Sequence, residues 1–235
     1  MIVDKANCSI KRRSKGEKTR LHILESAIQV IASHGIKGTT HRAIAKTANI
    51  QLSLTTYYFK DIEELIYQAI VLNTEKLLPC NDEMWLSIFK LIENYSPSEL
   101  KKLAVKKTLA QDISSVFVEQ VINNLMLTPH VLAVEQVLFT QTHISHALFE
   151  LADQHQQILL APYVKLCQYF NRTSAELDAE ILFNQHKQQE YQALALVINS
   201  PFEHKFNKQA IADYQQKLQA IIYRTLVLLL TKKIA

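Results

Sequence analysis

The chain has 235 residues, enough for one large domain or two modest ones, and its 48% of apolar residues argues against wholesale disorder. It contains three glycines, the last of them Gly38, and so few glycines exclude a fold rich in hairpins or phosphate-binding loops. Residues 1–60 hold 11 Lys and Arg against three acidic residues, whereas residues 61–235 hold 15 against 19. This asymmetry favours a front end that binds a polyanion, although a solvated basic tail would produce it as well.

The N-terminal sequence lacks the apolar segment of a secretory signal. The purely apolar run Leu226–Leu230 is too short to cross a membrane. Three widely spaced cysteines form no C-x-x-C pair, so neither a disulfide framework nor a thiolate zinc site is expected. We therefore expect a cytoplasmic protein without membrane association, cofactor or metal.

Capping residues and composition predict an all-α fold. The glycine-free sequence is rich in Leu, Ala, Gln, Lys and Glu, which are strong helix formers. Ser96–Glu99 and Ser200–Glu203 have the pattern of a capping box with proline at the first helical position. Asp61–Glu64, Thr128–Pro129 and Thr173–Glu176 mark further helix starts. The predicted helices span residues 17–34, 40–47, 53–59, 62–80, 82–95, 97–109, 111–127, 129–152, 154–170, 174–199 and 202–231.

The first three predicted helices form a unit of their own. Helix 17–34 has an apolar stripe that includes Ile23 and Ile31, and Gly35 stands where a left-handed cap would end it. Thr40 then caps a short helix, and a tight turn leads to a third one. This order and size are typical of a helix-turn-helix motif.

Residues 51–60, QLSLTTYYFK, contain the third helix of this motif and no acidic residue. Thr55 and Phe59 are four residues apart, so they share a face that would fill the core. The residues expected on the outer faces are Ser53, Leu54, Thr56, Tyr57 and Tyr58. Hydroxyl groups donate to phosphates, and Leu54 or a threonine methyl group could contact a thymine methyl group, so this helix suits a DNA groove. The residues alone leave open that both tyrosines pack against the following helix.

Two segments carry a family resemblance. Residues 19–50 read TRLHILESAIQVIASHGIKGTTHRAIAKTANI, and residues 55–65 read TTYYFKDIEEL. Together, and with their spacing, they resemble the DNA-binding domain of TetR-family transcriptional regulators from Glu17 to about Leu78. The resemblance implies a helix-turn-helix domain followed by a variable helical part. The rest of the chain resembles the family only in length and helical content.

The resemblance implies roles for residues by their position. Thr40 and Arg42 fall where the family contacts backbone phosphates. Ser53, Leu54, Thr56, Tyr57 and Tyr58 fall on the recognition helix, and Lys60 lies just beyond it.

Four positions depart from the family pattern, and one of them is Leu52, which lies where a polar base-reading residue often stands. Thr56 stands where most members have a tyrosine that touches phosphate, so Tyr57 and Tyr58 are candidates for that role. Ile62 stands where many members have a phosphate-contacting lysine, a contact that Lys60 could supply instead. Asn49 replaces a glycine of the turn, which is tolerable because asparagine accepts left-handed geometry better than most residues.

A basic arm precedes the first helix and includes Lys11, Arg12 and Arg13. Arms of this kind reach along the DNA backbone or into the minor groove in related proteins, and a disordered solubilising tail is the alternative. We therefore expect three regions. They are an arm at residues 1–16, a DNA-binding domain at 17–78 with its motif at 40–59, and a helical effector-binding and dimerisation domain at 79–235.

The last two predicted helices suggest a homodimer. Residues 226–230 are apolar all round, so they require burial on more than one side. Two helices from each of two chains would form a four-helix bundle about a two-fold axis, and the dimer would read a palindromic operator. Burial within one chain is the alternative. The expected interface residues are Leu194, Val197, Leu218, Ile221, Ile222, Thr225, Leu228 and Leu229.

A small-molecule effector pocket is expected inside helices 82–170, where aromatic residues are frequent. The candidate lining residues are Trp85, Phe89, Phe139, His143, His146, Phe149, Tyr163 and Cys167. Each of them could equally belong to an ordinary core. His143, His146 and Glu150 are helix neighbours, but a second ligand cluster is missing, so no metal site is expected.

Three hypotheses of function remain at this point. The first is a ligand-responsive repressor released from DNA by a small molecule. The second is a helical enzyme such as a di-iron protein, which is disfavoured because no histidine follows a glutamate by three residues and no P-loop or HExxH motif occurs. The third is a TetR-like DNA-binding protein controlled by a protein partner. The sequence does not separate the first from the third, nor repression from activation.

Overall fold

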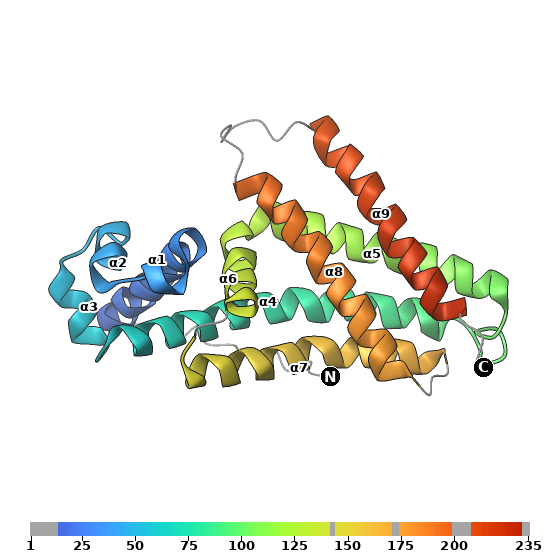
Figure 1. The fold of residues 1–235 in the computed structure, drawn as a ribbon, viewed down its shortest axis with the longest axis horizontal. Coiled ribbons are helices and arrows are strands. Elements are labelled where there is room, and N and C mark those ends of the chain that lie inside the picture. The colour runs from blue at the N-terminus through green and yellow to red at the C-terminus, as the bar shows by residue number, and fades with distance from the viewer. Residues whose placement is uncertain (1–13, 142–143, 171–173, 199–207, 232–235) are drawn as a thin grey trace, which may run out of the picture. The chain divides into compact units, whose positions relative to one another are not determined.

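A computed structural model describes residues 14–141, 144–170, 174–198 and 208–231. These ranges contain helices and no strand, which confirms the all-α prediction (Figure 1). The helices are α1 (Lys15–Gly38), α2 (His41–Thr47), α3 (Leu52–Tyr58), α4 (Ile62–Glu93), α5 (Leu103–Leu127), α6 (Pro129–Thr140), α7 (His146–Tyr169), α8 (Ala175–Ile198) and α9 (Lys208–Thr231). The caps predicted at Thr173 and Ser200 lie outside the described residues.

The chain divides into two compact units, Met1–Ala69 and Ile70–Ala235. This division and the expected domain boundary after residue 78 both fall within α4. The predicted break between helices 62–80 and 82–95 is wrong, because α4 runs unbroken through Pro79. A proline inside a helix costs about 3 kcal/mol. Leu77, which precedes Pro79, and Trp85, which follows it, are both buried, and their burial stabilises the helix around the proline.

The bounds predicted for helix 97–109 are wrong: the observed helix α5 begins at Leu103 and ends at Leu127. Ser96 and Glu99 do form a capping box: Ser96 N donates to Glu99 Oε2 (2.9 Å) and Glu99 N donates to Ser96 Oγ (3.4 Å). The box is followed by turns only, and α5 begins at Leu103. The break predicted at residue 110 is absent, because Leu109, Ala110 and Ile113 continue one buried face without interruption.

Residues 129–170 form two helices that differ from the two predicted ones. The predicted helix 129–152 is wrong: α6 ends at Thr140, and α7 begins at His146 after Ser145, whose backbone is extended. The break predicted at residue 153 is absent. Ser145 has the extended conformation of an N-cap residue but forms no side-chain cap hydrogen bond. The sequence signal for this boundary is therefore weak.

Aromatic packing joins four helices of the second unit. Trp85 of α4 lies edge-on to Tyr163 of α7, with ring centres 4.6 Å apart. Tyr163 stacks on Phe117 of α5 (5.8 Å) and meets Phe183 of α8 edge-on (5.4 Å). Around this cluster α7 packs along α8, and α9 packs along α5. Such pairs contribute beyond their buried area, so the cluster fixes the helices around the pocket described below.

The first unit has a small core of its own. Ile23, Ile31 and Ile44 are fully buried, which confirms the predicted apolar stripes. Asn49 has φ 52°, so the prediction of a left-handed asparagine in the turn is confirmed. Gly35 has φ 69° but ψ 178°, which is not the left-handed helical cap that the sequence suggested. This region of backbone space is open essentially to glycine alone, and it breaks the regular course of α1.

Candidate functional site

The helix-turn-helix begins with a capped short helix. Thr40 Oγ1 accepts a hydrogen bond from Ala43 N (3.2 Å), which fixes the start of α2. At the other end Ile50 N donates to Ala45 O (3.0 Å), and Asn49 turns the chain toward α3. Helix α2 buries Ile44 and Ala45, so its opposite face is presented to solvent.

Two residues anchor α3 in the core of the first unit. The Thr55 side chain is fully buried, and its hydroxyl donates to Leu52 O (2.8 Å) and lies 3.1 Å from His41 Nδ1 of α2. Phe59 is 1% exposed, and the guanidinium of Arg20 lies 5.2 Å from its ring centre. The core roles predicted for Thr55 and Phe59 are confirmed, and the orientation of α3 follows from them.

The opposite face of α3 carries hydroxyl and aromatic groups. Ser53 and Thr56 are exposed, and Tyr57 is 79% exposed, so Tyr57 does not pack against the following helix. Leu54 and Tyr58 are half-buried. The rings of the two tyrosines meet edge-on, with centres 5.1 Å apart. The Tyr58 hydroxyl lies beside Gly16 at the start of α1, 3.4 Å from the point where a Cβ atom would stand.

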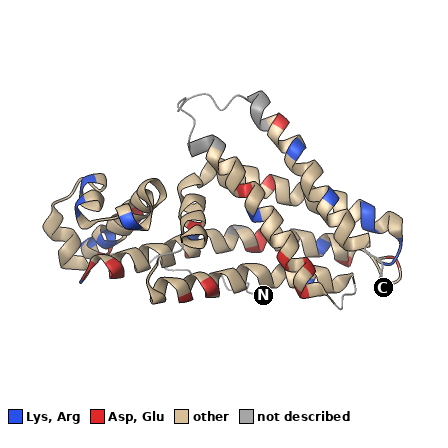
Figure 2. Cartoon of the chain, in the orientation of Figure 1, with Lys and Arg blue, Asp and Glu red and all other residues tan. Residues whose placement is uncertain are grey.

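The helix-turn-helix is basic. Residues 40–60 contain Arg42, Lys46 and Lys60 and no acidic residue, and all three basic side chains are exposed. Figure 2 marks the basic residues of α1 and α2 in blue. Acidic residues return only at α4, where Glu64 N donates to Asp61 Oδ1 (2.8 Å) and confirms the predicted cap. Lys11, Arg12 and Arg13 of the arm lie outside the described residues.

Comparison with known families matches this domain. Residues 23–69 fit the family described as bacterial regulatory proteins, tetR family. The chain carries a TetR-family DNA-binding domain. Regulators of this family are DNA-binding transcription factors rather than enzymes, so the enzyme hypothesis is set aside on the family match. A comparison with curated proteins found no significant match.

Solved structures share the whole fold of this chain. A transcriptional regulator from Rhodococcus sp. Rha1 has 16% identity and a TM-score of 0.61, with 90% of this chain and 96% of that chain covered. The fatty acid degradation regulator FadR from Bacillus halodurans has 16% identity and a TM-score of 0.55 (94% and 98% covered). A proposed regulator from Saccharomonospora viridis in complex with choline has 14% identity and a TM-score of 0.58 (88% and 96% covered). These similarities establish the fold, a helix-turn-helix domain followed by a larger helical domain.

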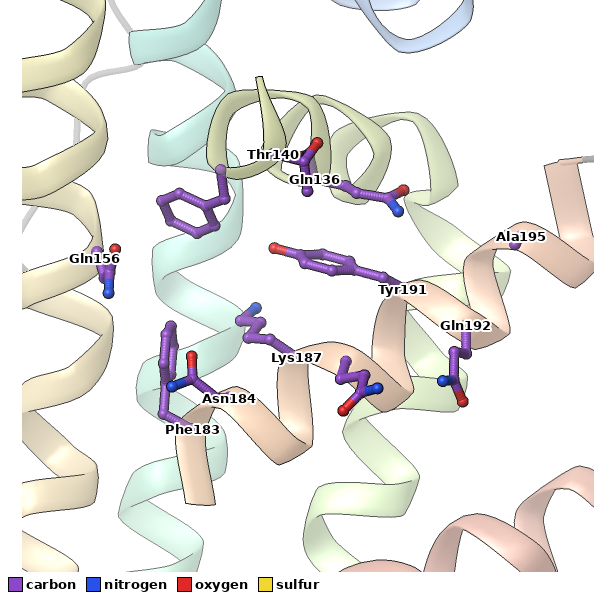
Figure 3. Close-up of a pocket in the computed structure, with 11 residues that line it drawn as sticks. Gln136, Thr140, Gln156, Phe183, Asn184, Lys187, Tyr191, Gln192 and Ala195 are labelled. Atoms are coloured by element: carbon purple, nitrogen blue, oxygen red, sulfur yellow. Dashed lines mark hydrogen bonds between the residues drawn. The ribbon is translucent and has the colours of Figure 1, made fainter. Parts of the chain in front are cut away.

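The second unit contains a pocket of about 550 Å³ between α6, α7 and α8 (Figure 3). Its volume is in the range of small-molecule sites. Figure 3 shows Lys187 and Tyr191, one turn apart on α8, directed into the space below α6. The lining residues are Gln136, Phe139, Thr140, Gln156, Phe183, Asn184, Lys187, Gln188, Tyr191, Gln192 and Ala195.

A buried ion-pair network forms the back of this pocket. Lys187 Nζ lies 2.6 Å from Glu135 Oε1 of α6 and 2.8 Å from Glu190 Oε2 of α8. The Tyr191 hydroxyl donates to Glu135 Oε1 (3.1 Å), and Asn124 Nδ2 of α5 donates to Glu190 Oε1 (3.1 Å). Both carboxylate side chains are at most 2% exposed. The ammonium group therefore joins α6 to α8, and the hydrogen bond from Asn124 to Glu190 connects α5 to the same network.

Burial and charge act in opposite directions on these groups. Burial disfavours the charged form of Glu135, but the attraction of Lys187 and the interaction with His155 together outweigh it and lower the pKa of Glu135 to about 2. Burial also disfavours charged Lys187, yet Glu135 and Glu190 hold the pKa of Lys187 well above its ordinary value. His186, hydrogen-bonded to the Tyr163 hydroxyl behind the pocket, has a pKa lowered by burial to about 4. Lys187 and Glu135 are thus charged at neutral pH, and His186 is neutral.

Of the pocket residues predicted from sequence, one lines the pocket and several belong to the adjoining aromatic core. Phe139 lines the pocket. Trp85, Tyr163 and Cys167 are buried in the adjoining aromatic core, and Phe89 stacks at the edge of that core, 5.7 Å from Trp85. Trp85 and Tyr163 also border a hollow of about 10 Å³, which is room for about one water molecule.

The candidates on the first turns of α7 lie outside the pocket. His146 and Phe149 are exposed, and His146 Nδ1 lies 3.6 Å from Glu150 Oε1. His143 lies outside the described residues. Within the described ranges, no three His, Cys, Asp or Glu side chains are grouped closely enough to hold a metal ion. In the same ranges, none of the helices is long and apolar enough to span a membrane.

Sequence reasoning missed the residues that dominate the pocket, Lys187 and Tyr191 of α8. A signal was present. Lys187 and Glu190 are three residues apart, between the apolar residues Phe183 and Leu194 of the same face, and a charged pair on a buried face needs a partner. The sequence does not reveal that Glu135 of α6 is this partner.

The predicted interface residues differ in burial. Leu194, Leu218, Ile222 and Leu229 are buried within the protomer, Ile221 and Thr225 are half-buried, and Leu228 is 71% exposed. The side chain of Val197 lies outside the described residues. Two further apolar residues, Leu177 and Ile181, are exposed near the start of α8. The start of α8 and the end of α9 lie at the same end of the second unit (Figure 1).

Proposed function

We propose that this transcriptional regulator is a homodimeric repressor that binds a palindromic operator and is released by a small-molecule effector. The observation that carries the proposal is the outer face of α3. It exposes Ser53, Thr56 and Tyr57 in a segment without a single acidic residue. Such a face, beside the exposed basic side chains of Arg42, Lys46 and Lys60, suits contact with a polyanion. The first unit would bind DNA, and the second would bind effector and partner.

The roles on DNA follow from exposure and chemistry. Thr40 and Arg42, at the start of α2, would contact backbone phosphates, as would Lys60 beyond α3. Ser53, Thr56 and Tyr57 would reach into the major groove. Half-buried Leu54 and Tyr58 would contact the groove edge. The arm residues Lys11, Arg12 and Arg13 would add contacts that increase affinity without reading sequence.

A dimer is supported by apolar surface at one end of the second unit. Leu177, Ile181 and Leu228 are 45–71% exposed there, and half-buried Ile221 and Thr225 continue the stripe of Leu228 along α9. A second copy that covers this surface would form the four-helix bundle expected from sequence. Replacement of Ile181 by aspartate should then produce monomers in light scattering, whereas the same change at exposed Leu86 should not.

An effector is supported by the pocket between α6, α7 and α8. Lys187 lines it and also bridges Glu135 and Glu190, so a bound molecule that shifts Lys187 would alter how α6 packs on α8. A coupling of about 1–3 kcal/mol would be enough to change DNA occupancy several-fold. Control by a protein partner remains the second candidate. A pocket-filling change, Ala195→Trp, should abolish induction by a small molecule but not control by a protein.

The test is titration of the purified protein onto a labelled duplex from upstream of its own gene, with unrelated DNA as competitor and at two salt concentrations. We expect saturable binding of one dimer per palindrome that resists the competitor. Arg42→Ala should weaken binding and reduce the log-log salt slope by roughly 0.9, the value for one phosphate contact. Lys90→Ala, in the second unit, is the control. Binding that the competitor abolishes, or an unchanged slope for Arg42→Ala, would contradict the proposed interface.

A further inference from the structure

Most of the side chains that line the pocket are uncharged and polar, although apolar atoms form the larger part of the exposed wall. Five amides and two hydroxyls line it: Gln136, Thr140, Gln156, Asn184, Gln188, Tyr191 and Gln192. A side-chain amide carries both donors and acceptors, and so does a ligand hydroxyl. Each amide can therefore donate a hydrogen bond to a hydroxyl oxygen or accept one from a hydroxyl hydrogen. These groups lie at the open side of the pocket, where a ligand with hydroxyl groups could replace the water around them with direct hydrogen bonds.

The one charge on the described part of the wall is already neutralised. Lys187 Nζ lies within 2.8 Å of two carboxylates, Glu135 and Glu190, and no carboxylate is among the described residues that line the pocket. An anionic ligand that approached Lys187 would therefore meet two negative charges directly behind it. A cationic ligand would meet the ammonium group first. A ligand of either charge therefore has no unpaired counter-charge on the described part of the wall.

Aromatic rings provide the remaining walls. Phe139 of α6, Phe183 and Tyr191 of α8 line the same pocket as the amides. Phe139 is held by a stacked contact with buried His155, 5.7 Å between ring centres, and the Tyr191 hydroxyl is held by Glu135. Rings that are fixed in this way suit a ligand with a flat apolar face.

We propose that the pocket binds an uncharged ring compound with several hydroxyl groups, the chemistry that glycosides and nucleosides share. The hydroxyls would pair with the amides of α6, α7 and α8, and the flat face of the ring would lie on Phe139 or Phe183. This proposal rests on the assignment of the pocket to the effector. It excludes organic cations and phosphorylated metabolites as the main ligands, because their charge has no unpaired counter-charge on the described wall.

The first experiment follows thermal unfolding by the fluorescence of Trp85, the single tryptophan, which lies in the adjoining aromatic core of the second unit. The probes are methyl glycosides of glucose, galactose and mannose, together with adenosine and uridine. Each probe is paired with charged counterparts, namely uronates and amino sugars for the glycosides and 5′-monophosphates for the nucleosides. We expect an uncharged member to raise Tm and to bind at least tenfold more tightly than its charged counterparts. Glycoside or nucleoside binding identifies the source. Preference for a charged counterpart, or no binding by any probe, overturns the proposal.

The second experiment adds a charge to the wall. Asn184→Asp replaces an exposed amide of the lining by a carboxylate of nearly equal size. It should improve binding of the amino sugar, or of an amino-nucleoside, by roughly fivefold and weaken that of the uncharged ligand. Asn94→Asp, exposed beyond the end of α4, is the matched control and should change neither. Equal effects of the two variants would show that the ligand binds elsewhere, against the proposal.

Operator binding separates this proposal from the proposed function. If an uncharged ligand binds the wild-type protein but not the Ala195→Trp variant, and operator affinity is unchanged by the ligand, the ligand class stands and the effector role fails. If the protein does not bind its operator specifically, the repressor role fails whatever the pocket binds. If a charged ligand releases the operator, the repressor role stands and the ligand class fails.

Discussion

The buried ion-pair network behind the pocket gives the sharpest prediction on stability. Glu135→Gln removes the negative charge that faces Lys187 and leaves the amide oxygen to accept the hydrogen bond from Tyr191. Lys187 then keeps Glu190 as its one carboxylate partner within the described residues. We expect the second unit of this variant to be less stable at neutral pH, because the ammonium group stays buried with half of its compensation.

The size of the loss follows from the pKa of Glu135. Its folded value of about 2 lies below its ordinary value of 4.5. A carboxyl group whose pKa is lowered by folding stabilises the protein fully above its unfolded pKa, and this contribution is lost as the pH falls through 4.5 toward 2. The shift corresponds to about 3 kcal/mol at pH 7. Roughly 1 kcal/mol of it should be gone at about pH 4, and more than half at about pH 3.

The assay is urea unfolding followed by Trp85 fluorescence. Because Trp85 is the single tryptophan and lies in the second unit, the signal does not report on the first unit. Protein concentration is kept equal for both proteins, since dimerisation adds to apparent stability. Glu150→Gln, an exposed position on α7, is the control and should stay within about 0.5 kcal/mol of wild type.

Two outcomes would refute this reasoning. If Glu135→Gln were as stable as wild type at pH 7, the combined attraction of Lys187 and His155 would not exceed the cost of burying the carboxylate. If the loss were equal at pH 7 and pH 3, it would come from packing rather than from charge, because protonation of Glu135 in the wild type would leave it unchanged.

Three further predictions concern the first unit and are measured by hydrogen exchange of the α1–α3 amides. Phe59→Ala should lower the stability of this unit by about 3–5 kcal/mol, because it empties a fully buried aromatic site. Asn49→Ala should cost about 1–2 kcal/mol at φ 52°, whereas Asn49→Gly should be nearly neutral; equal effects would argue against backbone strain. Gly35→Ala should cost about 1–3 kcal/mol, and a neutral result would show that α1 can straighten there.

The helix-turn-helix could be predicted from sequence because its determinants are local. Asn49 turns the chain with its own backbone, Thr40 caps α2 from three residues away, and Thr55 and Phe59 share a face by spacing alone. Each of these signals acts within a few residues, so a single sequence is enough to read it.

The pocket could not be predicted because its determinants are distant in sequence. Lys187 meets Glu135 across 52 positions of the chain, and the aromatic residues near both are distributed between core and pocket by helix packing alone. The helix break predicted near Pro79 is wrong for a related reason. Pro79 looks like a break in a local pattern, but burial of Leu77 and Trp85 on either side carries the helix through it.

The double position of Lys187 has a consequence for how this pocket can change over time. A substitution of Lys187 would alter the pocket wall and remove the cation that Glu135 and Glu190 share in the interior, so few substitutions here are compatible with a marginally stable fold. Asn184 and Gln188 lie at the exposed rim, where exchange of one amide for another side chain costs little stability. Descendants with new ligand preferences should therefore differ at the rim and keep the lysine.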